Sequence, residues 1–245
     1  MMRTVASVFL GMGCVMSTAL AAETVTLVTT EYPPYYAASL PDKGVVAAIT
    51  SEAFKKVGYD VTVEFLPWAR AVSEVEKGTY DGLLGVWHSA ERERFIAYSD
   101  PLIDNEIGLV ALKDRNISYK TLSELKPYRV GTVRGYANPT SFVEAGLTTD
   151  EANDDLTNLK KLVAGRIDLA LIDKGLSDYL IAGQMPDSKG AVVWLDPPVS
   201  KIPMFNGFAK NKAGHEKRTA DFARGLAELR ASGEFTAIVQ KFGFR

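Results

Sequence analysis

Hydrophobic positions in the first half of the chain alternate between strand-like and helix-like spacing. The pattern predicts strands over residues 24–30, 60–67 and 80–87, and helices over residues 45–58 and 68–78. Each of the two helices runs up to a glycine, the residue that most often ends a helix. Strands that alternate with helices in this way are typical of βαβ units around a buried parallel sheet.

The same alternation begins again further along the chain, after a long predicted strand over residues 107–114. A capping box from Thr121 to Glu124 opens a short helix. The elements that follow are a strand over 128–134, helices over 139–146 and 154–165, a strand over 166–173, a helix over 174–183 and a strand over 191–196. Another strand around residues 203–211 and two amphipathic helices over 215–233 and 234–243 complete the chain.

Two such units connected by two long strands predict an α/β fold of two lobes with two crossing strands. We expect each lobe to be a mostly parallel sheet flanked by helices. One lobe is assigned to residues 22–111 plus 206–245, and the other to residues 112–205. A ligand would bind between the lobes.

The first 21 residues predict a cleavable signal peptide. Arg3 precedes the apolar run from Val5 to Val15, and Ala19-Leu20-Ala21 is a small-x-small cleavage pattern. A lipoprotein signal around Cys14 is the alternative, but it requires an aliphatic residue where Gly11 stands. Export to the periplasm is therefore expected.

Charge and cysteine content exclude several kinds of protein. Without Arg3, 27 basic residues stand against 30 acidic ones, which is not the electrostatic footprint of a nucleic-acid-binding protein. Cys14 is the only cysteine and lies in the predicted signal, so the mature chain has no disulfide or thiolate site. No metal-spaced cluster or phosphate-binding loop is present, and neither a metal nor a cofactor is predicted.

Polar and aromatic residues follow the predicted strands at their carboxyl ends, where open parallel sheets bind ligands. These candidate residues are Glu31, Tyr32, Tyr35, Trp68, Trp87, His88, Ser89, Arg92, Arg134, Tyr136 and Asp173. Because they come from both lobes, we expect them to face one cleft.

Arg92 in one lobe and Asp173 in the other could together hold a zwitterion, since a guanidinium grips a carboxylate and a carboxylate accepts an ammonium. Simpler roles remain open. Arg92 could form a surface ion pair with Glu91 or Asp100, and Asp173 could cap the helix that starts at Lys174.

The aromatic candidates also have two interpretations. Tyr32 and Trp68 could form a stacking wall for an apolar, aromatic or cationic group of a ligand. They could equally be parts of a packed turn and of the core.

Six segments of the chain resemble segments of one protein family and occur in the same order as in that family. They are EYPPYY, KGTYDGLLG, SAERERFIAYSDPL, YRVGTVRGYANPTSF, LVAGRIDLALID and LAELRASGEFTAIVQKFGF. The chain resembles the bacterial extracellular solute-binding proteins of family 3, which serve ABC importers of polar amino acids. The resemblance implies a clamshell fold, a small amino-acid-like ligand, a permease partner in the inner membrane, a monomer and no catalytic residues.

The resemblance also implies roles for single residues. Arg92 corresponds to the arginine that binds the ligand carboxylate, with Ser89 in place of the threonine of a Thr-x-x-Arg pattern. Asp173 corresponds to the aspartate that binds the α-ammonium, Tyr32 to the aromatic residue that covers the ligand side chain, and Glu31 to a nearby acid.

Two aromatic residues depart from the family pattern. Trp87 stands where a small or hydroxyl residue is usual, and Tyr136 follows Gly135 where threonine is usual. Both changes remove carboxylate-binding groups and narrow the site. The ligand is therefore expected to be an unusual amino acid or a different kind of molecule.

Two other functions fit the same resemblance. Some proteins of this fold resemble periplasmic dehydratases of the cyclohexadienyl type, in which Glu31, His88 or Asp173 would be the acid or base. A receptor that presents its ligand to a sensor kinase or chemoreceptor would use the same clamshell.

Overall fold

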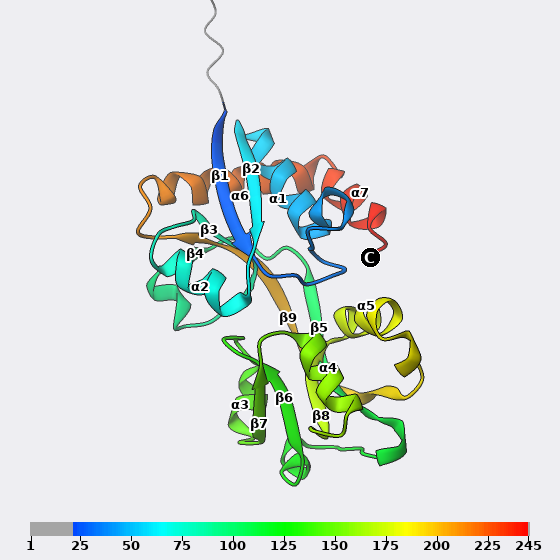
Figure 1. Ribbon diagram of the computed structural model, residues 1–245. Helices are drawn as coiled ribbons and strands as arrows, with labels where there is room; N and C mark the ends of the chain where they lie inside the picture. The colour runs from blue at the N-terminus through cyan, green and yellow to red at the C-terminus, as the bar shows by residue number, and fades with distance from the viewer. Residues whose placement is uncertain (1–21, 245) are drawn as a thin grey trace, which may run out of the picture.

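The computed structural model describes residues 22–244, and in it the chain forms two lobes connected by two long strands (Figure 1). The predicted signal peptide lies outside the described residues. Eight of the nine described strands follow one path, in the order β2-β1-β3-β9-β5-β8-β6-β7, and the ninth, β4, lies off this path and pairs with β9. The two-lobed α/β fold expected from the sequence is confirmed.

The first lobe contains three parallel strands and a short fourth strand. These strands are β1 (Glu23–Thr29), β2 (Tyr59–Phe65), β3 (Gly82–Trp87) and β4 (Ile96–Tyr98). Its helices are α1 (Val45–Lys56), α2 (Trp68–Glu76), α6 (His215–Ala231) and α7 (Glu234–Lys241). β1 pairs in parallel with β2 along its whole length and with β3 at Leu27 and Val28.

The second lobe repeats this arrangement with shorter elements. It contains the parallel strands β6 (Arg129–Val133), β7 (Thr148–Ala152) and β8 (Leu169–Asp173), and the helices α3 (Thr140–Glu144), α4 (Asp155–Val163) and α5 (Lys174–Gln184). Five short 3-10 helices complete the described elements: η1 (Pro41–Lys43), η2 (Arg92–Arg94), η3 (Lys113–Arg115), η4 (Leu122–Leu125) and η5 (Pro186–Ser188).

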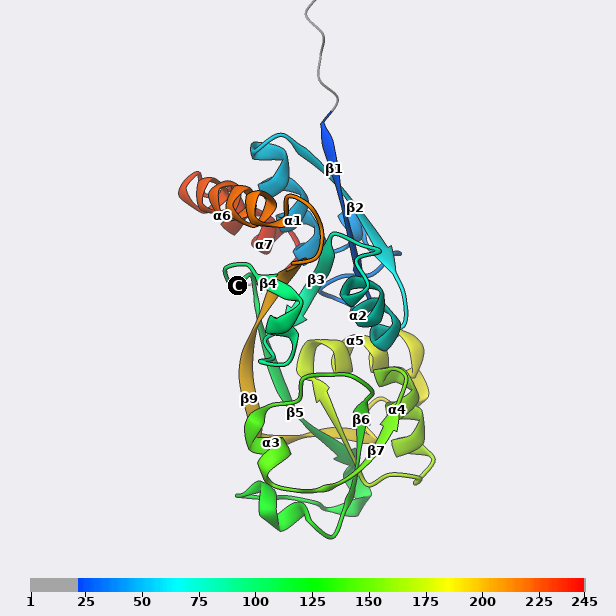
Figure 2. The same cartoon turned by 90° about the vertical axis from the view of Figure 1, so that its left-hand side faces the viewer.

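The crossing strands β5 (Asp104–Leu112) and β9 (Val192–Ala209) run antiparallel and side by side between the lobes (Figure 2). β9 pairs with β3 in the first lobe, whereas β5 pairs with β8 in the second. Each sheet is therefore mixed, with three parallel strands and antiparallel crossing strands. The exact lobe boundaries proposed from the sequence stay a prediction.

The structure differs from the sequence pattern at two strands. β7, which the pattern missed, is a sheet-edge strand in which only Ala152 is buried, so it has no hydrophobic alternation to detect. The two strands expected over 191–196 and 203–211 are parts of the single strand β9. The register of β9 against β5 shifts between Leu195 and Ser200, which leaves Pro197 and Pro198 outside the regular ladder.

The first lobe is held together by close packing of α1 against α6. Phe54 of α1 lies 4.9 Å from Phe222 of α6 and 5.8 Å from Phe208 of β9, measured between ring centroids. Gly225 of α6 faces the backbone of Ala53, and a Cβ atom there would overlap the Ala53 carbonyl oxygen. The glycine therefore lets the two helices approach closely.

Gly225→Ala should lower the free energy of unfolding by about 1–3 kcal/mol, because the two helices must move apart. Gly183→Ala in α5 is the matched control, since no atom of the described residues lies within 4 Å of its Cβ position. That control should be neutral or stabilise the protein by up to about 1 kcal/mol through helix propensity. Urea denaturation measures both values, and equal changes in the two variants would contradict this account of the packing.

No helix within residues 22–244 is both long enough and apolar enough to cross a membrane.

Candidate functional site

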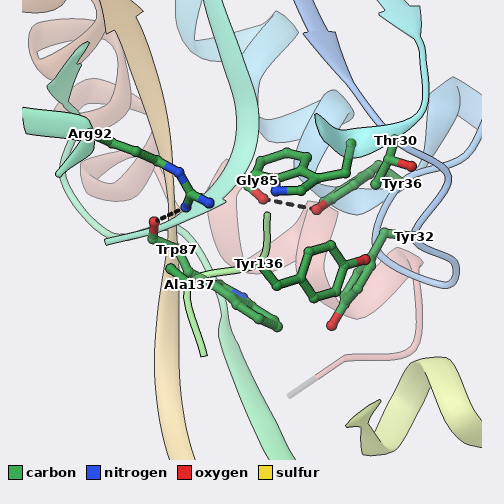
Figure 3. Close-up of a pocket in the computed structure, with 9 residues that line it drawn as sticks. Thr30, Tyr32, Tyr36, Gly85, Trp87, Arg92, Tyr136 and Ala137 are labelled. Atoms are coloured by element: carbon green, nitrogen blue, oxygen red, sulfur yellow. Dashed lines mark hydrogen bonds between the residues drawn. The ribbon is translucent and has the colours of Figure 1, made fainter. Parts of the chain in front are cut away.

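A small cavity lies between the lobes, next to the carboxyl ends of β1, β3 and β6. Its lining residues are Thr30, Tyr32, Tyr36, Trp68, Gly85, Trp87, Arg92, Tyr136 and Ala137 (Figure 3). The side chains leave a free volume of about 20 Å³, which is room for about one water molecule. Five of the predicted residues line this cavity: Tyr32, Trp68, Trp87, Arg92 and Tyr136.

The charged group of the cavity is the guanidinium of Arg92, which is 6% exposed. Its Nη1 donates a hydrogen bond to the carbonyl oxygen of Trp87 at 3.2 Å, and its Nη2 donates to the carbonyl oxygen of Gly135 at 2.5 Å. The guanidinium also lies over the ring of Trp68, 5.3 Å from the centroid. Burial lowers the pKa of Arg92, but an arginine still carries its charge at neutral pH.

Arg92 does not form the surface ion pair that was the alternative to ligand binding. Glu91 lies 3.5 Å from Arg94, and no carboxylate among the described residues lies within 4.0 Å of the Arg92 guanidinium. The charge is therefore buried against carbonyl groups and an aromatic ring.

The apolar part of the cavity is formed by five aromatic side chains: Tyr32, Tyr36, Trp68, Trp87 and Tyr136. The ring of Tyr136 lies 6.3 Å from Tyr32, 6.0 Å from Trp68 and 5.3 Å from Trp87, with interplanar angles of 63 to 83°. We call Tyr32, Trp68 and Trp87 the aromatic box. Because Tyr136 belongs to the second lobe and the box to the first, these contacts cross the cleft.

The box is held in place by polar contacts at its edges. The indole Nε1 of Trp68 donates to the carbonyl oxygen of Gly135 at 2.9 Å, and that of Trp87 donates to Oδ1 of Asn105 at 2.7 Å. The hydroxyl of Tyr32 is buried and has no hydrogen-bond partner within residues 22–244. Such an orphan polar group is costly and marks a place where a ligand could donate or accept.

Asp173 is fully buried and does not line the cavity. Its Oδ1 accepts from the N–H of Leu176 at 2.8 Å, so it caps α5, and its Oδ2 accepts from Tyr35 Oη at 3.1 Å and Asn105 Nδ2 at 3.0 Å. Burial raises the pKa of Asp173 to about 6. The capping role considered for this residue is present, and binding of an ammonium stays a prediction.

Three other predicted residues lie outside the cavity. Glu31 is exposed and accepts from the N–H of Ala38, and Arg134 is exposed beside Glu151 at 3.4 Å. The N–H of Ser89 donates to the Tyr98 hydroxyl at 2.9 Å, which helps to shape the turn before η2.

Sequence reasoning missed one acid near the cavity. Asp155, the first residue of α4, is 5% exposed, and its Oδ2 accepts from the hydroxyl of Tyr136 at 2.9 Å. Burial raises the pKa of Asp155 to about 7. The pair Asp154-Asp155 at a predicted helix start was the available signal, but it indicates a helix cap as readily as a site.

The raised pKa values of Asp155 and Asp173 have a defined effect on stability. Between about pH 4 and pH 7 the folded protein keeps protons that the unfolded chain has released, so the free energy of unfolding falls as pH rises through this range. This contribution is complete below about pH 4 and lost above about pH 7.

Asp155→Asn, which has no proton to release, should reduce the fall in stability between pH 4 and pH 7. Urea denaturation at both values measures the change. Asp178→Asn, at an exposed position of α5, is the control and should keep the wild-type pH dependence. An unchanged slope in Asp155→Asn would show that this carboxyl does not titrate in the expected range.

Solved structures of similar fold include proteins of three different kinds. A histidine kinase sensor domain with similarity to periplasmic binding proteins has a TM-score of 0.80 and 22% identity over 91% of this chain and 97% of its own. The substrate-binding protein of an amino acid ABC transporter has a TM-score of 0.75 and 17% identity over 90% and 99%. An ancestral amino-acid-binding protein, a precursor of cyclohexadienyl dehydratase, has a TM-score of 0.72 and 18% identity over 89% and 95%.

At these identities the similarity establishes the fold. The comparison with curated proteins found no match. The family model of the bacterial extracellular solute-binding proteins, family 3, matches residues 25–245, which is nearly the whole length after the predicted signal peptide. The chain therefore belongs to family 3 of the bacterial extracellular solute-binding proteins.

Proposed function

We propose that this protein is a periplasmic receptor that captures a small carboxylate, an amino acid or a related acid, between its lobes and delivers it to an ABC importer. The observation that carries the proposal is the buried guanidinium of Arg92 at the cleft, which has no carboxylate partner among the described residues. A ligand carboxylate would supply the missing negative charge.

The geometry supports closure around such a ligand. Arg92 and Trp68 of the first lobe both donate to one carbonyl oxygen of the second, that of Gly135. A carboxylate at this place would accept the same two bonds with a full charge, which makes them shorter and stronger. Two charge-assisted contacts at about 1.5–3 kcal/mol each, with aromatic burial, are compatible with the ~8 kcal/mol of micromolar binding.

The two alternative functions predict different behaviour. A receptor for a sensor kinase or chemoreceptor would bind its ligand in the same way, and its gene would stand apart from permease and ATPase genes. A dehydratase would form product from prephenate or arogenate. The His88 ring, an acid-base candidate, lies outside the cavity lining and pairs with Glu93 at 2.7 Å on the surface.

Arg92→Ala should weaken binding of any carboxylate ligand about 100-fold, because it removes the buried charge partner. A thermal-shift screen of refolded, ligand-free protein against amino acids, amines, dicarboxylates and aromatic acids identifies the ligand. A ligand at a hundredfold over its Kd adds ~2.7 kcal/mol to the stability, which is a visible shift.

Arg94→Ala is the matched control, since Arg94 lies in the same short helix but is exposed, and its side chain donates hydrogen bonds to Glu91. It should bind like the wild type. If Arg92→Ala keeps the affinity of the control variant, the carboxylate site is not at Arg92 and the proposed function loses its support.

A further inference from the structure

Two groups of the second lobe, one backbone carbonyl and one aromatic side chain, contact the candidate binding residues of the first lobe. The carbonyl oxygen of Gly135 accepts hydrogen bonds from Arg92 and Trp68, and the next residue, Tyr136, places its ring against the aromatic box. Gly135 has φ +78°, a conformation that favours glycine and that turns the chain into the cleft here. The residue pair Gly135-Tyr136 thus occupies both parts of the site.

These two groups describe the kind of molecule that the first lobe accepts. One is an oxygen acceptor on the guanidinium, and the other is a six-membered aromatic ring a short distance away. We infer that the ligand is an aromatic carboxylate, whose carboxylate replaces the Gly135 carbonyl on Arg92 and Trp68 and whose ring replaces that of Tyr136 in the aromatic box. This inference rests on the proposed function and names its ligand class.

The contacts of the box favour an aromatic ring over an aliphatic group of similar size. Tyr136 meets Tyr32, Trp68 and Trp87 at steep interplanar angles, the arrangement in which the positive edge of one ring meets the negative face of another. Each such pair adds an attraction between the rings beyond the burial of apolar area. A saturated ring or a polar side chain gains nothing from this edge-to-face attraction.

One polar group of the box remains for the ligand. The Tyr32 side chain is 2% exposed, and its hydroxyl has no hydrogen-bond partner in the described part of the chain. This side chain lies beside Tyr136 in Figure 3. Burial and the neighbouring Asp173 raise the pKa of the Tyr32 hydroxyl well above its usual value, so it keeps its proton and can donate. An oxygen substituent on the ligand ring would satisfy it, which favours a hydroxylated aromatic acid.

The ligand and Tyr136 cannot occupy the box together. The free volume of the cavity, about 20 Å³, holds about one water molecule and no ring. The ligand must therefore displace Gly135 and Tyr136, and the self-occupied form lowers its apparent affinity by reducing the fraction of protein that is competent to bind. A carboxylate can displace the Gly135 carbonyl because it brings a negative charge to Arg92, whereas the carbonyl is a neutral acceptor.

Isothermal titration calorimetry with 4-hydroxyphenylacetate tests the inference. We expect the refolded, ligand-free protein to bind this acid about ten-fold tighter than 4-hydroxycyclohexylacetate, which lacks only the aromaticity. Tyramine, which has the ring without the carboxylate, should bind at least about 100-fold more weakly.

Variants at Tyr136 test the displacement. Tyr136→Ala should bind 4-hydroxyphenylacetate about ten-fold tighter than the wild type, because the competing ring is gone. Tyr179→Ala, which removes an exposed tyrosine of the same lobe, is the control and should stay within about two-fold of the wild type.

Three results would overturn the inference: equal affinities for the aromatic and the saturated acid, equal affinities in Tyr136→Ala and Tyr179→Ala, or tight binding of L-alanine or L-glutamate without binding of either ring acid. The last result would leave the proposed function standing. A protein that binds no carboxylate in the screen or by calorimetry would remove the proposed function together with the inference. If Tyr136→Ala does not fold, the affinities of the wild type for the aromatic and the saturated acid still test the inference.

Discussion

A positive charge buried at the junction of two lobes is the constraint on which the site depends. Removing a guanidinium from water is costly unless hydrogen bonds and polarisable groups replace the solvent. Arg92 obtains these groups from the Trp87 carbonyl and the Trp68 ring of its own lobe and from the Gly135 carbonyl of the other. The closed arrangement is therefore stabilised by the same charge that would attract a ligand.

The opposite side of the cleft has the opposite electrostatic character. Asp155 and Asp173 are buried in the second lobe, and their contacts include the tyrosine hydroxyls of Tyr136 and Tyr35. Neither carboxylate has a cation within 4.0 Å among the described residues. Because burial favours their protonated forms, the charge of this side of the cleft depends on pH near neutrality.

Movement of the lobes would be carried by β5 and β9, since these strands connect them. Hinge closure usually changes a few backbone angles in such connections. The register shift of β9 near Pro197 lies on the side of the second lobe, where β9 pairs with β5. A ligand that contacts both lobes would bind the closed form better than an open form. It would therefore shift the equilibrium between the two forms towards closure.

Much of this architecture follows from the sequence alone. Hydrophobic periodicity is a local property, so the buried strands β1, β3 and β8 and the amphipathic helices could be predicted, as could the two-lobed order of the fold. The position of Arg92 just after a buried strand could be predicted for the same reason. The edge strand β7 and the continuity of β9 could not, because pairing at an edge or across prolines depends on a distant partner strand.

The site itself was decided by tertiary structure. The sequence determined which residues stand at the carboxyl ends of the strands, but not which of them share a cavity. The packing of the lobes brought Tyr136 against Trp68 and Trp87, and the fold of the second lobe buried Asp155 beside Tyr136. Glu31 and Arg134 stayed in solvent. Contacts between residues far apart in the chain depend on how the two lobes meet, and no local pattern of residues encodes that geometry.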